Sequence, residues 1–138
     1  MYLYLGRQIS YNNSDWVTLY RNLARAQKVW GMVVRVLQCE GASMRAKGLF
    51  YKAICQAVLL YSCETWTITD AMLAPLAGFH HHAARRLTGT VARRQPDGSW
   101  LYPPLGKAMK DAGLYSIQTY IWCRQARMVD YISTRAIH

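Results

Sequence analysis

The chain has 138 residues, a formal net charge of +10 and a hydrophobic content of 52%. Its length suits one domain with a modest core, and its hydrophobic content excludes a disordered tail. The excess of positive charge favours a polyanionic partner, with nucleic acid as the first candidate and an anionic membrane surface as the second. The longest apolar run, at 57–61, is far shorter than the ~20 residues that span a bilayer, so no membrane-spanning segment is expected.

Four cysteines are spread along the chain and form no C-x-x-C pair. They are Cys39, Cys55, Cys63 and Cys123. This spacing is typical of reduced thiols rather than of a disulfide framework. Because the first residues also lack the charged and apolar regions of a secretory signal, we predict an intracellular protein, either cytoplasmic or nuclear.

The first nine residues predict a β-hairpin. Leu3-Tyr4-Leu5-Gly6 is a short apolar and aromatic run that ends in glycine, and Arg7-Gln8-Ile9 follows it. A turn-prone segment at 10–13 then separates the hairpin from the helical part of the chain.

A first helix is expected from about Asp15 to Gln38. Its N-cap is expected at Asn13 or Ser14, and Gly41 is a typical stop signal behind it. Apolar residues recur in this helix at helical spacing. They are Trp16, Leu19, Tyr20, Leu23, Val29, Trp30, Val33 and Leu37.

A second helix is expected to begin after Ser43, its N-cap, and to run to about Tyr61. Its predicted buried stripe consists of Leu49, Phe50, Ala53, Ile54, Ala57, Leu60 and Tyr61. Residues 63–66 interrupt the helical pattern. A third helix then follows the N-cap Thr69 and ends at Gly89. Its predicted buried face consists of Met72, Leu73, Leu76, Phe79, Ala83 and Leu87.

The remaining third of the chain begins with a change of composition. Residues 90–104 are rich in arginine, proline and glycine and predict an exposed loop, with Trp100 and Tyr102 as its anchors. A short helix is expected at 105–112, with Gly113 as its stop, and a last helix from Ser116 to about Thr134.

These elements predict a mainly α fold with a short N-terminal β-hairpin, a three-helix bundle and a C-terminal helical extension. Residues 1–89 form the expected hairpin and bundle, 90–104 the exposed loop, and 105–138 the extension. Trp16, Trp30 and Trp66 are expected in the core, because aromatic residues on apolar stripes are usually buried.

Four basic residues share one side of the first helix: Arg21, Arg25, Lys28 and Arg35. At ~100° per residue their spacing places them within a sector of about 80°. Residues 17–62 contain seven basic residues and one acid, whereas a solvated helix face normally mixes both signs. We predict that this stripe binds phosphate groups; the alternative is a basic face that serves solubility alone.

Two further polar features of the sequence are a run of three histidines and the acid Glu64. Three consecutive histidines at 80–82 do not predict a metal site, because successive helical residues point about 100° apart. One histidine is expected to pack inward, with His81 and His82 on the nucleic-acid face. Glu64 is expected to pair with an arginine or with backbone N–H groups, because no second group shares acid–base work with it. No cofactor is expected.

Several segments resemble reverse transcriptases of non-LTR (LINE-type) retrotransposons. Leu3-Tyr4-Leu5-Gly6 is similar to the primer grip that follows the palm of these enzymes. Leu49-Phe50-Tyr51-Lys52-Ala53, followed by Leu59-Leu60-Tyr61-x-x-Glu64-Thr65-Trp66, resembles their thumb. Residues 79–89 are similar to a later thumb helix, and 102–105 to a post-thumb segment.

The resemblance implies a thumb-like bundle in which Tyr4, Leu5 and Gly6 position the primer end. The paired palm aspartates, which hold the two metal ions of polymerisation, have no counterpart here, since no two aspartates of this chain are adjacent. We therefore expect a non-catalytic fragment that grips a primer–template duplex of DNA or RNA, together with a palm domain encoded upstream. The alternatives are a helical protein-interaction module with a basic face and a decayed gene fragment without function.

Overall fold

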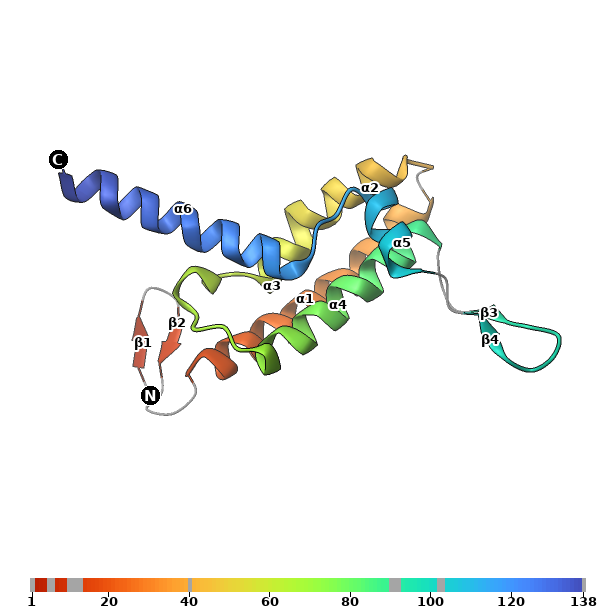
Figure 1. Cartoon of the computed structure of the whole chain (residues 1–138), viewed down its shortest axis with the longest axis horizontal. Coiled ribbons are helices and arrows are strands. Elements are labelled where there is room, and N and C mark those ends of the chain that lie inside the picture. The colour runs from red at the N-terminus through yellow and green to blue at the C-terminus, as the bar shows by residue number, and fades with distance from the viewer. Residues whose placement is uncertain are drawn as a thin grey trace.

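The computed structural model describes residues 2–4, 7–9, 14–39, 41–89, 93–101 and 104–137. As predicted, the chain is mainly helical, with a small antiparallel hairpin at its start (Figure 1). None of the helices in the described ranges combines the length and the apolar character that a bilayer crossing needs.

The N-terminal hairpin has the predicted form. β1 (Tyr2–Tyr4) pairs antiparallel with β2 (Arg7–Ile9), and Tyr4 lies opposite Arg7. Leu5 and Gly6, between the strands, lie outside the described residues. β2 contacts α1 (Ser14–Cys39), so the hairpin is next to the first helix.

Two long helices, α1 and α4 (Asp70–Thr88), lie side by side and form one edge of the molecule (Figure 1). Both match their predicted extents. The Thr69 hydroxyl accepts the N–H of Met72 at 3.3 Å, which confirms the N-cap of α4. The helix ends at Gly89, whose φ of 69° is in the left-handed region that glycine adopts at low cost.

The core lies between these two helices and the second helix. On the predicted face of α4, Leu73 is half-buried and the other members are buried. On α1, Leu19, Trp30 and Leu37 are buried. The Trp30 ring meets the rings of Tyr51 and Phe79 edge-on, with centroids 6.0 and 6.5 Å apart, so aromatic contacts join all three helices.

The second helix begins as predicted but is not uniform. The Ser43 hydroxyl accepts the N–H of Ala46 at 3.2 Å and caps α2 (Met44–Tyr51). The helix then continues as a π-helical turn, η1 (Lys52–Gln56), and as α3 (Ala57–Leu59). A short 3₁₀ helix, η2 (Cys63–Thr65), occupies the predicted interruption.

The predicted buried stripe of the second helix is wrong. Leu49, Phe50, Ala53 and Tyr61 are exposed, and Ile54 and Ala57 are half-buried, so only Leu60 is fully buried. The face that packs inward instead contains Gly48, Tyr51, Cys55, Gln56 and Leu59. Gly48 lies against the carbonyl of Ala112, and only a residue without a side chain permits this close approach. Because neighbouring helical positions point about 100° apart, Leu49 and Phe50 then turn toward solvent.

Residues 93–101 lie in the predicted exposed loop and are mostly exposed, and they also form a second small ladder. β3 (Arg93–Arg94) pairs with β4 (Trp100–Leu101) around a turn that contains Pro96, Asp97 and Gly98. This ladder projects away from the helices (Figure 1), and Trp100 is 55% exposed. The prediction that Trp100 anchors this segment is therefore wrong, and Tyr102 lies outside the described residues.

The C-terminal helices pack on α4. α5 (Leu105–Ala112) has the predicted bounds, and Gly113 ends it in the left-handed region. α6 (Ile117–Ile137) is three residues longer than predicted at its C-terminal end, and that end extends away from the bundle (Figure 1). Ile117 and Ile121 join the core, whereas Ile132 is exposed. The division at residue 89 stays a prediction.

Candidate nucleic-acid interface

The four predicted phosphate-binding residues all lie on α1, which runs without interruption from Ser14 to Cys39. Arg25, Lys28 and Arg35 are exposed, and Arg21 is half-buried. The uninterrupted helix keeps the spacing on which the prediction depends, so the four residues share one side. We call these four residues the α1 stripe.

The N-terminal half of the α1 stripe borders a groove of about 430 Å³ between α1 and α3. Its lining comprises Arg21, Asn22, Arg25, Ala57, Val58 and Tyr61. The buried Asn22 amide donates to the Tyr61 carbonyl oxygen at 2.8 Å, which fixes the distance between the two helices at this point. Two cations of the stripe therefore stand at the rim of a preformed depression.

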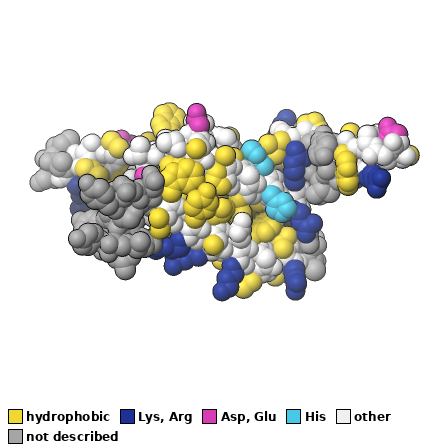
Figure 2. Space-filling model, turned by 90° about the horizontal axis from the view of Figure 1, so that it is seen from below, with side chains coloured by type: hydrophobic (Ala, Val, Ile, Leu, Met, Phe, Trp, Pro, Cys, Tyr) yellow, Lys and Arg dark blue, Asp and Glu magenta, His cyan; other side chains and the backbone are white. Residues whose placement is uncertain are grey.

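Two acidic groups in the described part of the chain have partners of their own. Asp15 is the only acid of α1, and its Oδ2 accepts the N–H of Thr67 at 2.9 Å. Glu64 Oε1 lies 3.8 Å from Arg124 Nη1, which confirms the predicted arginine partner. The face seen in Figure 2 has basic side chains at the rim of an apolar patch, and acidic side chains are sparse there.

The hairpin residues expected at a primer end are only partly placed. Tyr4 ends β1, beside the turn of the hairpin, and Leu5 and Gly6 lie outside the described residues. The backbone contact between β2 and α1 brings the hairpin to the N-terminal end of the helix that carries the stripe.

The three histidines have three different environments. His80 is fully buried, which confirms that one of them packs inward. Its Nε2 donates to the Tyr115 carbonyl oxygen at 2.7 Å, and its Nδ1 accepts the hydroxyl of Tyr51 at 2.7 Å. This assignment follows from the Tyr115 carbonyl, which can only accept. His81 is half-buried and His82 is exposed.

These environments determine the charge of the histidines. Burial lowers the pKa of His80 to about 4. The hydrogen bond to Tyr115 raises this pKa, but burial has the larger effect. Burial and the nearby Arg85 lower the pKa of His81. His80 is therefore neutral at pH 7, and His81 is mainly neutral, so neither replaces an arginine as a permanent charge.

The buried thiols are unreactive. Burial raises the pKa of Cys55 to about 11 and that of Cys63 to about 12, so neither is a thiolate at neutral pH. Within the described residues, no three side chains of His, Cys, Asp or Glu gather into a possible metal site.

One basic cluster was missed in the sequence. One groove is lined by Lys52 of η1 together with Arg124 and Arg127 of α6. Lys52 is more than seventy positions away from the two arginines in the chain. The only signal for it was the spacing of Arg124 and Arg127, which places both on one side of a helix. Nothing in the sequence indicated that α6 lies beside Lys52.

No protein-family model matches the sequence, and no curated protein or solved structure is significantly similar to it.

Proposed function

We propose that this chain binds duplex nucleic acid without sequence preference, through the phosphate groups and the α1 stripe. The observation that carries the proposal is a one-sided row of cations on an uninterrupted helix, three of them exposed. From Arg21 to Arg35 the row covers about 21 Å at ~1.5 Å per residue, long enough to meet several phosphates of one duplex. The net charge of +10 acts in the same direction by attracting polyanions over longer distances.

In this proposal the chain is a non-catalytic, thumb-like part of a retrotransposon reverse transcriptase. The motif resemblance, the helical bundle behind an N-terminal hairpin and the position of that hairpin beside α1 support this assignment. Tyr4, Leu5 and Gly6 would contact the primer end, while the metal-binding carboxylates of polymerisation would come from a separate palm domain.

A helical protein-interaction module is the second candidate, and one observation favours it. The C-terminal half of α6 exposes large apolar side chains, including Val129, Tyr131 and Ile132. Exposed apolar residues along one helix are typical of a surface that packs against another protein. In that case the basic stripe would meet an acidic partner.

Charge reversal on the α1 stripe separates these candidates. Replacing the exposed Arg25, Lys28 and Arg35 together by Glu should weaken duplex binding by at least tenfold at 100 mM salt. The loss should be the same for duplexes of unrelated sequence, because the contacts are to phosphates. The matched control reverses three exposed cations elsewhere: Arg93, Lys107 and Lys110. Equal losses in both variants would show that net charge alone drives binding. No loss in either would favour the protein-interaction module.

A further inference from the structure

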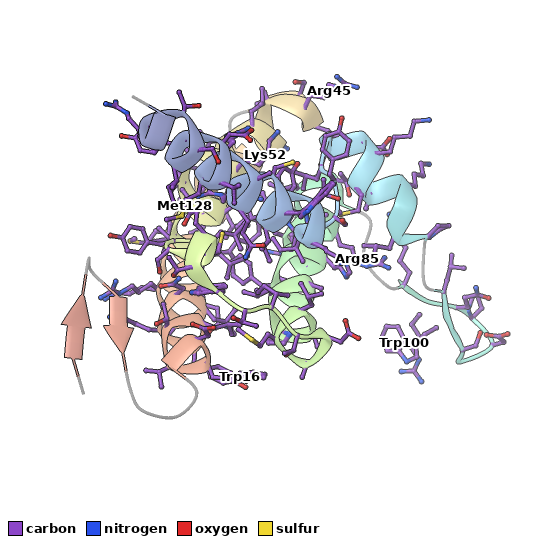
Figure 3. All side chains as sticks on the ribbon, turned by 60° about the vertical axis from the view of Figure 1, so that its left-hand side comes forward. Trp16, Arg45, Lys52, Arg85, Trp100 and Met128 are labelled. Atoms are coloured by element: carbon purple, nitrogen blue, oxygen red, sulfur yellow. The ribbon has the colours of Figure 1, made fainter. Side chains whose placement is uncertain are left out.

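A second basic groove lies between η1 and α6, formed by residues other than the α1 stripe. It has a volume of about 150 Å³ and is lined by Lys52, Gln56, Tyr120, Cys123, Arg124 and Arg127. Lys52 and Gln56 are the first and last residues of the π-helical turn. The four α6 residues fall at positions 120, 123, 124 and 127, so they share one side of that helix. Figure 3 labels Lys52 on the second helix, beside α6.

The lining of this groove is positively charged. It contains three cationic side chains and no carboxylate. Glu64 offsets one cation, since its Oε1 is 3.8 Å from Arg124 Nη1. Lys52 Nζ lies 5.8 Å from the centre of the Tyr120 ring, which positions the ammonium group without neutralising it. Arg127 is exposed and has no ion-pair partner within the described ranges. Lys52 and Arg127 therefore leave the groove with an excess of positive charge.

A buried polar atom gives a second, independent indication of a ligand. The Gln56 side chain lines the groove and is only 3% exposed. Its Oε1 is buried and has no hydrogen-bond partner among the described residues. Buried carbonyl oxygens are normally paired, because an unpaired one loses its bonds to water without compensation. A rotation of the Gln56 amide about its terminal bond would turn this oxygen toward the groove, where an O–H or N–H group of a ligand would supply the missing donor.

We propose that this groove binds a phosphate monoester, the class that includes a mononucleotide and the phosphorylated end of a nucleic-acid strand. Lys52 and Arg127 hold the phosphate oxygens, and Gln56 Oε1 accepts a hydrogen bond from a hydroxyl or amino group of the ligand. The π-helical turn brings Lys52 and Gln56 to the groove together, and such turns often accompany binding sites in helices. This site is independent of duplex binding by the α1 stripe.

The proposal is tested by calorimetric titration of the full chain with adenosine 5′-monophosphate and with inorganic phosphate. We expect saturable 1:1 binding of the nucleotide, weakened at least tenfold by Lys52→Gln with Arg127→Gln. The matched control, Lys107→Gln with Lys110→Gln, removes the same charge from exposed positions on α5 and should leave the affinity unchanged. Absence of saturable binding by the natural chain, or equal losses in both variants, would overturn the proposal.

Two further arms complete the test. Gln56→Met keeps the side-chain volume and removes the unpaired oxygen. This variant should fold at least as well as the natural chain and bind the nucleotide more weakly. Unchanged affinity would remove Gln56 from the site and overturn the proposal.

An oligonucleotide with a 5′-phosphate is then compared with the same strand without it. Preference for the phosphorylated strand assigns the site to strand ends, and equal affinity assigns it to free nucleotides. Reversal of the α1 stripe should leave nucleotide binding intact, which distinguishes failure here from failure of duplex binding.

Discussion

At the scale of single residues, His80 joins three segments that are distant in the chain. Its ring bonds the hydroxyl of Tyr51 on α2 and the carbonyl of Tyr115 before α6. Burial raises the pKa of Tyr51, so the phenol stays protonated and donates to the ring. The backbone N–H of Tyr115 donates in turn to the Tyr120 hydroxyl at 3.0 Å. A neutral His80 is therefore part of the packed structure.

This network predicts a loss of stability in acid. Between pH 6.5 and pH 4, the unfolded chain binds a proton at residue 80 and the folded chain does not. The contribution of His80 is therefore complete above pH 6.5 and declines as the pH falls, by up to about 3 kcal/mol in total. Urea unfolding between pH 7 and pH 4 measures it. His80→Gln, which can keep both hydrogen bonds but does not titrate, should flatten the profile in this range. His82→Gln, at an exposed position, should leave the pH profile of stability as it is in the natural chain. If neither variant changes the dependence of stability on pH, His80 is not the group responsible.

Gly48 gives a second prediction at this scale. A Cβ at this position would overlap the carbonyl oxygen of Ala112, a backbone atom that cannot move aside alone. We expect Gly48→Ala to destabilise the fold by about 1–3 kcal/mol, although alanine is the better helix former. Gly31→Ala on α1 is the matched control, because nothing lies within 4 Å of its added methyl group. It should stabilise the chain by about 1 kcal/mol, so a gain at both positions in thermal unfolding would contradict the close contact.

At the scale of elements, α5 and α6 complete the core around α4. Ala108 and Ala112 of α5 and Ile117 and Ile121 of α6 are buried members of the same core cluster. The Gln125 amide donates to the carbonyl oxygens of Cys63 and Trp66, so α6 also fixes η2. Beyond Met128, the described side chains of α6 are exposed.

We therefore expect the two ends of α6 to differ in their effect on folding. A chain that ends after Gly89 loses the residues that cover α4 and the acceptor of His80, so it should melt at a much lower temperature or without cooperativity. A chain that ends after Met128 keeps all side chains of α6 that are buried or half-buried among those described, so it should melt within a few degrees of the full chain. Circular dichroism checks both. A cooperative 1–89 fragment of full stability would show that residues 105–138 are an independent appendage.

The sequence predicted the ends of elements better than their faces. Helix ends depend on local features, namely a hydroxyl that accepts a backbone N–H at the N-cap and a glycine with positive φ at the C-terminus. The predicted N-caps Ser43 and Thr69 and the predicted stops Gly89 and Gly113 are confirmed. The stripe of the second helix failed because it was chosen by hydrophobicity, whereas the packing depends on Gly48 admitting the backbone of α5. The basic groove depends on α6 lying beside Lys52 and Gln56, a tertiary relation that the spacing of Arg124 and Arg127 alone does not reveal.

At the scale of the whole molecule, positive charge gathers at two places that differ in geometry. The α1 stripe is a row along one helix, suited to an extended row of phosphates, whereas the groove at Lys52 is a depression suited to one phosphate group. The net charge of +10 disfavours the compact state through self-repulsion, and binding of a polyanion would relieve it. The excess positive charge would then serve the binding of a polyanion by the complete molecule.

The salt dependence of duplex binding tests this account most directly. The logarithm of the association constant should fall linearly with the logarithm of the salt concentration, with a slope of about −0.9 for each phosphate contact on B-form DNA. Reversal of Arg25, Lys28 and Arg35 should make the slope shallower by about 3, since three contacts are lost. The control reversal of Arg93, Lys107 and Lys110 should leave it unchanged. An affinity independent of salt, or the same slope in the natural chain and the α1 variant, would contradict the account.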